Sequence, residues 1–187
     1  MKLRFLGLSV LLLAVASFTV ACGASSGADE DAGLAKFTPS ETIYALDDLL
    51  EIGFKKDKSF DVEGLTAATH AYYGFWGVDP YDRKEYEARF YPSHSDAVEF
   101  GVVFADERTG PDAVIKAGET MWDEGTKDAR SCARTSSNGN CHLSKYGDDV
   151  IYGNMILICQ GRDSSTSLEE CGALLGALVP GLDVSAG

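Results

Sequence analysis

The sequence has few basic residues: 16 Lys and Arg stand against 29 Asp and Glu, and the formal net charge is −13. Binding to nucleic acid needs clustered Lys and Arg that neutralise phosphates. The deficit of positive charge therefore excludes a nucleic-acid partner and favours a well-solvated surface. For the same reason we expect no electrostatic attraction between the chain and anionic lipid headgroups.

Histidine is also scarce, and the motifs of common catalytic and cofactor sites are missing. His70, His94 and His142 have neither the i, i+4 spacing nor a Cys/His ligand pattern, so we expect no zinc site. The sequence lacks a G-x-S-x-G nucleophile elbow, a glycine-rich phosphate loop and an EF-hand loop. We therefore expect no cofactor and no metal, and enzymatic activity is the less favoured interpretation.

Only one long hydrophobic run occurs, from Phe5 to Val20, and it follows Lys2 and Arg4. A short positive region, an apolar core and a small-residue exit are typical of a secretory signal. The run is a little shorter than the roughly 20 apolar residues that a membrane-spanning helix needs. Since no later stretch comes close, we expect an exported chain without a second membrane segment.

The exit from this run, Thr19-Val20-Ala21-Cys22, resembles the lipobox of bacterial lipoprotein precursors. The resemblance implies cleavage after Ala21, a diacylglyceryl group on Cys22, and anchoring to the outer face of the cytoplasmic membrane or to an outer membrane. Two or more acyl chains attach a protein firmly where one does not. Thr19 departs from the Leu usual in that class. Ala14-Val15-Ala16 leaves open an ordinary signal-peptidase cut, which would release a soluble protein.

Cysteine parity agrees with lipidation of Cys22, because it leaves an even number of other cysteines. An even number suits two disulfides in an oxidising compartment, although four cysteines allow three pairings. Proximity favours one bridge across a short polar loop and one from a strand to the first turn of a helix. The favoured pairs are Cys132–Cys141 and Cys159–Cys171.

Composition divides the chain into four parts. Residues 1–21 form the signal peptide, and residues 22–36 are small, polar and acidic, as in a flexible tether. Residues 37–182 have the size and apolar content of a single domain, and residues 183–187 form a tail. Without Lys2 and Arg4 the formal charge of −13 becomes −15.

Cap and stop signals predict the helices. Thr38 as N-cap and Gly53 as terminator predict a helix over 39–52. Ser93 begins a second helix that ends at Gly110-Pro111, with Gly101 in its buried stripe. A weaker helix is expected over 112–122, residues 123–141 are expected to be loop, and a last helix starts near Ser167.

Alternation and β-rich composition predict the strands. They cover Leu65–Trp76, Glu85–Phe90 and Asp149–Gln160, and Gly153-Asn154 forms a tight turn or a bulge in the last of these. Polar residues alternate with apolar ones in Glu85–Phe90, so Glu85 and Glu87 are expected on a solvated face. The predicted class is α+β: an antiparallel sheet of about four strands, with three or four helices mainly on one face.

The aromatic segment Tyr72-Tyr73-Gly74-Phe75-Trp76 is the strongest candidate for a binding site. Alternation places Tyr72 and Trp76 on one face and Tyr73 and Phe75 on the other. An exposed aromatic face could stack a sugar, bind a cation or dock a partner protein. The alternative is a strand buried on both faces. The candidate binding residues are Tyr72, Trp76, Asp79, Tyr81 and Asp82.

Three functions agree with these features. The first is a membrane-anchored extracytoplasmic lipoprotein that binds an unknown small ligand or an envelope protein. The second is a cell-envelope hydrolase, which would need a cleft joining His70 or His94 to Asp79, Asp82 or Glu85. The third is a purely structural role in which the aromatic face packs against a partner.

Overall fold

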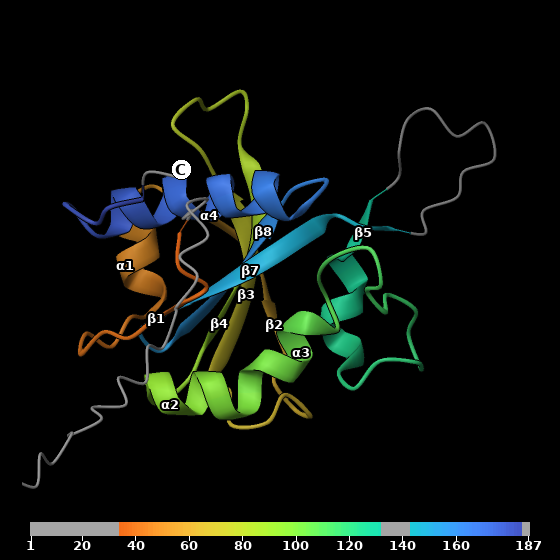
Figure 1. Cartoon of the computed structure of the whole chain (residues 1–187). Helices are drawn as coiled ribbons and strands as arrows, with labels where there is room; N and C mark the ends of the chain where they lie inside the picture. Colours follow the sequence, from red (N-terminus) through yellow and green to blue (C-terminus); the bar gives the residue numbers. More distant parts are fainter. Residues whose placement is uncertain (1–33, 132–142, 185–187) are drawn as a thin grey trace, which may run out of the picture.

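The computed structural model describes residues 34–131 and 143–184. Its centre is a six-stranded sheet with the strand order β1-β7-β8-β4-β3-β2, accompanied by a two-stranded pair, β5 and β6 (Figure 1). Neighbouring strands of the large sheet are antiparallel, except that β1 pairs parallel with β7. The strands are β1 Phe37–Thr38, β2 Lys55–Phe60, β3 His70–Trp76, β4 Lys84–Phe90, β5 Arg130–Ser131, β6 Leu143–Ser144, β7 Tyr146–Tyr152 and β8 Met155–Gln160.

The α+β class is confirmed, but the expected number of about four strands is too low for the six-stranded sheet. Two edge strands account for the difference. Strand β2 exposes every residue except Phe60, and three of its residues are lysines. Its sequence therefore lacks the alternation of apolar and polar residues that predicts a strand. Strand β1 has only two residues. Lysines on an edge strand also block pairing with another sheet.

Six helical segments accompany the sheet in the described residues. The longest, α4, is capped by Asp163, whose side chain accepts a hydrogen bond from the Thr166 N–H. The π-helical turn η1 joins α2 to α3 directly, and η2 is a 3₁₀ helix. The segments are α1 Leu46–Glu51, α2 His94–Asp96, η1 Ala97–Gly101, α3 Val102–Asp106, η2 Asp123–Asp128 and α4 Ser164–Leu178.

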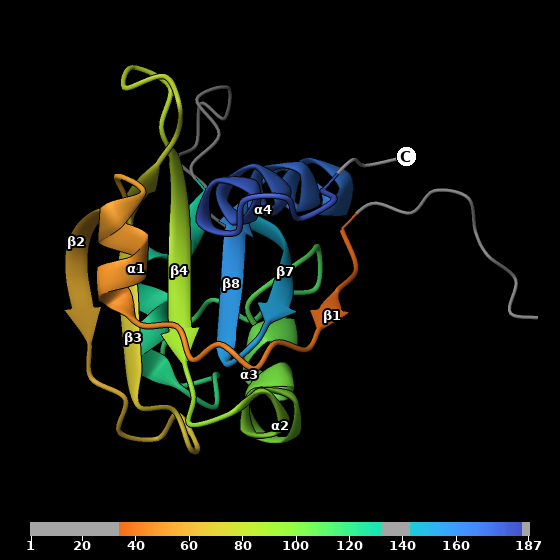
Figure 2. The same ribbon diagram turned by 90° about the vertical axis from the view of Figure 1, so that its left-hand side faces the viewer.

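Helices cover both faces of the sheet, which corrects the expectation of helices mainly on one face. In Figure 2, α1 and α4 lie in front of the strands and α3 lies behind them. Strand β8 shows why: Leu157 and Cys159 pack in one core cluster with α1 and α4, whereas Ile156 and Ile158 pack in another with η1 and α3. A strand that is apolar on both faces needs cover on both.

The first helix is much shorter than the expected 39–52 helix. Thr38 ends β1 instead of capping a helix, and α1 begins only at Leu46. The acidic side chain at the third helical position, Asp48, accepts a hydrogen bond of 2.7 Å from the Ala45 N–H. Residues 112–122 form no helix, and the helical turn η2 lies instead in the stretch expected to be loop.

Several local predictions hold. The side chain of Ser93 accepts a hydrogen bond from the Asp96 N–H at the start of α2, and Gly153-Asn154 forms the tight turn between β7 and β8. The disulfide Cys159–Cys171 is present, with a Cα–Cα distance of 5.6 Å. The other predicted pair, Cys132–Cys141, lies outside the described residues.

The polar face of β4 is buried, although its alternation predicted a solvated face. Glu87 is 1% exposed and Arg89 is fully buried, beneath the layer that carries Trp122. The Arg89 guanidinium lies 5.1 Å from the centre of the Trp122 ring. Arg108, after α3, is buried in the same layer, and burial lowers its pKa. This face is therefore a core that contains charge.

Candidate functional site

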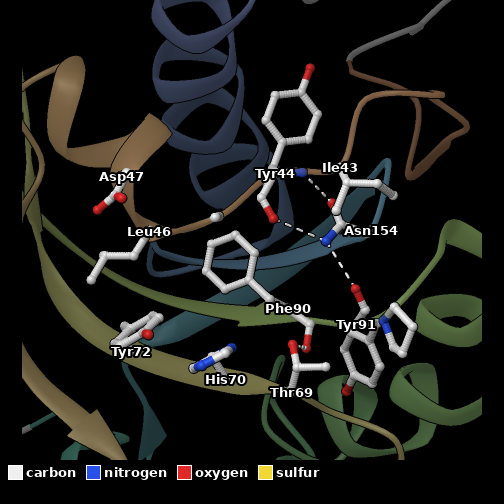
Figure 3. Close-up of a pocket in the computed structure, with 12 residues that line it drawn as sticks. Ile43, Tyr44, Leu46, Asp47, Thr69, His70, Tyr72, Phe90, Tyr91 and Asn154 are labelled. Atoms are coloured by element: carbon white, nitrogen blue, oxygen red, sulfur yellow. Dashed lines mark hydrogen bonds between the residues drawn. The ribbon is translucent and has the colours of Figure 1, made fainter.

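The candidate site is an open pocket of about 490 Å³ at one end of the sheet (Figure 3). This volume lies in the usual range for small-ligand pockets, roughly 300–1,000 Å³. Its walls come from the chain before and at the start of α1, from the adjoining ends of β3 and β4, and from the β7–β8 turn. The lining residues are Ile43, Tyr44, Ala45, Leu46, Asp47, Thr69, His70, Tyr72, Phe90, Tyr91, Pro92 and Asn154.

The buried side chain of Asn154 holds two walls of the pocket together. Its Oδ1 accepts a hydrogen bond of 2.7 Å from the Tyr44 N–H, and its Nδ2 donates to the Tyr44 carbonyl at 3.0 Å. The same Nδ2 donates to the Tyr91 carbonyl at 2.9 Å. Figure 3 shows these bonds converging on Asn154 from both sides. A fully satisfied buried amide of this kind fixes the backbone around it.

Aromatic rings form the floor. His70 and Tyr72 are two residues apart on β3, so they lie on one face of the strand. Their rings are nearly parallel, at 10°, with centroids 5.9 Å apart. The Phe90 ring meets Tyr72 edge-on at 6.0 Å. His70 is exposed and Tyr72 half-buried, so the rings remain reachable from solvent.

The polar groups of the pocket are few. Burial raises the pKa of Tyr72, and the charge of nearby Asp47 raises it further, so the phenol stays protonated at neutral pH. Thr69 Oγ1 donates a hydrogen bond of 3.0 Å to the Phe90 carbonyl. The side-chain oxygen and nitrogen of Asn154 both form hydrogen bonds with backbone groups, so neither is directed at a ligand. The pocket is suited to stacking a flat or apolar group, with hydrogen bonds available at its rim.

Of the predicted binding residues, only Tyr72 lines this pocket. Trp76 is 6% exposed, and its indole Nε1 donates a hydrogen bond of 3.0 Å to the Ile52 carbonyl, so it belongs to the core. Asp79, Tyr81 and Asp82 lie on the exposed loop between β3 and β4, at the opposite end of β3 from His70. The structure therefore divides the predicted patch among a pocket, the core and a loop.

The residues named for a hydrolase do not meet in one cleft. Glu85 pairs with Phe75, five residues along β3 from His70. At about 3.3 Å per residue this separates His70 from Glu85 by roughly 17 Å. The ring Nδ1 of His94 is hydrogen bonded to the Gly153 carbonyl at 2.8 Å. The described part of the chain holds no cluster of three or more His, Cys, Asp or Glu fit for a metal ion.

Most of the residues that line the pocket could not be predicted from the sequence, because the walls are formed by segments that are distant along the chain. Asn154 contacts Tyr44 across 110 positions of the chain. The turn pair Gly153-Asn154 was recognised, but nothing local indicates that the Asn154 side chain points back to the residues before α1. Ile43 lies before α1, is 60% exposed and lines the pocket, although its helical spacing from Leu46 and Leu50 favours a place in a helix.

The fold and the pocket define a small α+β domain with one wall of the candidate site supplied by the segment that precedes α1. Residues 45–180 match the model of a family of unknown function, DUF6810, and the chain belongs to this family. Neither a curated protein nor a solved structure matched the chain. Within the residues that the structure describes, no helix has the length and apolar character needed to cross a membrane.

Proposed function

We propose that this protein is an exported lipoprotein, anchored through lipid on Cys22, whose folded domain binds a small, largely apolar or aromatic ligand in the pocket beside α1. The signal-like run and the lipobox resemblance support export and anchoring. The disulfide between Cys159 and Cys171 suits an oxidising compartment. The acidic chain would gain nothing from anionic headgroups, so the lipid supplies the attachment.

The observation that carries the binding proposal is the pair of parallel rings, His70 and Tyr72, at the floor of a ligand-sized pocket. Contiguous exposed apolar patches commonly mark interaction sites or ligand-binding grooves. Stacking on such rings contributes about 0.5–1.5 kcal/mol beyond the area that it buries. Leu46 and Phe90 add apolar surface around them.

The binding test uses an uncharged fluorescent probe, N-phenyl-1-naphthylamine, titrated into residues 23–187 exported to an oxidising periplasm. Tyr72→Ala removes part of the floor and should weaken probe binding about tenfold, equivalent to about 1.4 kcal/mol. Tyr81→Ala is the matched control, because Tyr81 is 97% exposed and lies outside the pocket. Equal affinities for the two variants would remove the pocket from consideration. Native mass spectrometry of the gently purified protein would then identify any ligand carried from the cell.

The anchoring test uses the full chain in a bacterial host fed labelled palmitate. The wild-type protein should incorporate label and sediment with membranes, whereas Cys22→Ser should do neither. A soluble, unlabelled wild-type protein would instead indicate the ordinary cleavage after Ala16.

A further inference from the structure

Residues 34–45, here called the strap, are held to the domain by polar contacts and by two side chains, Leu34 and Tyr44, that pack in the core cluster with α1 and α4. Tyr44, at 9% exposed, is the only buried residue of the strap. Backbone hydrogen bonds run from the Ile151 N–H to the Lys36 carbonyl at 2.7 Å and from the Gly153 N–H to the Thr38 carbonyl at 2.9 Å. Segments with few buried apolar contacts open at low free energy, independently of global unfolding.

The ammonium group of Lys36 forms a second attachment. It lies 3.0 Å from Asp148 Oδ1, 3.2 Å from Asp149 Oδ1 and 3.5 Å from Asp106 Oδ1. Burial lowers the pKa of Lys36, but the charges of Asp149 and Asp148 more than offset this and raise it above its usual value. The lysine is therefore charged at neutral pH, and it ties the strap to both β7 and α3.

The same segment supplies a wall of the pocket. Ile43, Tyr44 and Ala45 line it, and the Asn154 side chain holds the backbone of Tyr44 in place. Undocking of the whole strap would break the hydrogen bonds between Asn154 and Tyr44 and displace this wall. The pocket is complete only while the strap is docked.

We infer that docking of the strap sets the affinity of the pocket, with Lys36 as a positioning residue that acts at a distance from the ligand. This inference rests on the proposed binding function. A ligand that binds only the docked form must, by linkage, also stabilise docking. Because the strap overlaps the end of the proposed tether, residues 22–36, the lipid anchor and the pocket would be joined through one releasable segment.

The first test compares Lys36→Met with Lys55→Met, in which an exposed lysine of the edge strand β2 is replaced in the same way. Lys36→Met should weaken binding of N-phenyl-1-naphthylamine about fivefold, at the low end of typical couplings. Lys55→Met should bind as the wild type does. Hydrogen exchange followed by mass spectrometry should show faster exchange over residues 34–45 in Lys36→Met alone, and slower exchange when the probe is added.

The second test restores docking without the lysine. A Cβ built on Gly153 would lie 3.3 Å from the Cβ of Ser40, close to the separation of about 3.5–4.5 Å found in disulfides. Ser40→Cys with Gly153→Cys should therefore lock the strap when oxidised. In the Lys36→Met background, the oxidised lock should bind the probe about fivefold more tightly than the reduced form of the same variant. Strain at Gly153 is common to both forms and cancels in this comparison.

The outcomes separate the two proposals. Loss of affinity in Lys36→Met with recovery by the oxidised lock supports the coupling. Probe binding that is unchanged by Lys36→Met overturns the coupling and leaves the pocket intact. No probe binding by the wild type, by the locked form or by any variant overturns the proposed pocket and the coupling with it.

Discussion

Arg89 Nε donates a hydrogen bond of 2.6 Å to Oε1 of Glu87, two residues earlier on β4, and the two side chains are 0% and 2% exposed. Trp122 covers the guanidinium at 5.1 Å. Removing one partner from a buried pair leaves an uncompensated charge. Single substitutions of Glu87 or Arg89 should therefore destabilise the fold.

Glu87→Gln should lower the free energy of unfolding by about 3 kcal/mol, because it leaves the buried positive charge of Arg89 without a negative partner. The double variant Glu87→Leu with Arg89→Met should be much closer to the wild type, because it removes both charges. Urea denaturation at pH 7 measures all three proteins. A double variant as unstable as Glu87→Gln would contradict the pairing.

Two of the helical glycines, Gly101 and Gly172, should respond oppositely to substitution by alanine. A Cβ on Gly101 would lie 2.4 Å from Ile156 Cδ1, whereas one on Gly172 would lie 3.6 Å from its nearest neighbour. We expect Gly101→Ala to lower the unfolding free energy by about 1–3 kcal/mol through overpacking. Gly172→Ala should raise it by roughly 0.5–1 kcal/mol, as alanine normally does in a helix. Thermal unfolding of the pair checks both signs.

Replacing both Cys159 and Cys171 by Ala should lower the unfolding free energy by about 3 kcal/mol, since the bridge closes a short loop in the unfolded chain. The sequence separation is 12 residues. Chemical denaturation under oxidising conditions measures the loss. The same variant treated with a reductant reports separately on any bridge elsewhere in the chain.

The contribution of Asp149 to the stability of the protein should rise as the pH falls from 7 toward 5. Burial raises the pKa of Asp149 from 3.8 to about 6, against the opposing charge of Lys36. The folded state therefore binds this proton more tightly than the unfolded state, and the stabilisation is lost as the pH rises through 6. Between pH 7 and pH 5 the wild type should gain roughly 1 kcal/mol more than Asp149→Asn. Parallel denaturation curves for the two proteins would contradict this assignment.

Trp76→Ala and Tyr81→Ala should separate the core from the exposed loop. Trp76 is 6% exposed and Tyr81 is 97% exposed. Trp76→Ala should lower the free energy of unfolding by about 3–5 kcal/mol, as the replacement of a buried aromatic residue by alanine normally does. Tyr81→Ala should change stability by less than about 0.5 kcal/mol. A loss of partner binding with Tyr81→Ala at unchanged stability would assign a docking role to the loop.

The sequence by itself determined the features that depend on short-range signals. These include the α+β class, the capping of α2 by Ser93, the turn at Gly153-Asn154 and the pairing of Cys159 with Cys171. Alternation in β3 also placed Tyr72 and Trp76 in one core cluster and Tyr73 in another. Each of these features depends on residues that lie within about a dozen positions of one another in the sequence. Over so short a distance, backbone geometry allows few alternative conformations.

Only the tertiary structure decided which faces are buried and where a ligand can bind. Glu87 is a polar residue in a short alternating segment, and it is buried because the part of the chain that carries Arg108 and Trp122 packs over this face of β4. The pocket exists because Asn154 bonds to Tyr44, 110 positions away. Contacts of this range are set by how hydrophobic faces pack and by where buried polar groups find partners, and neither leaves a periodic pattern in the sequence.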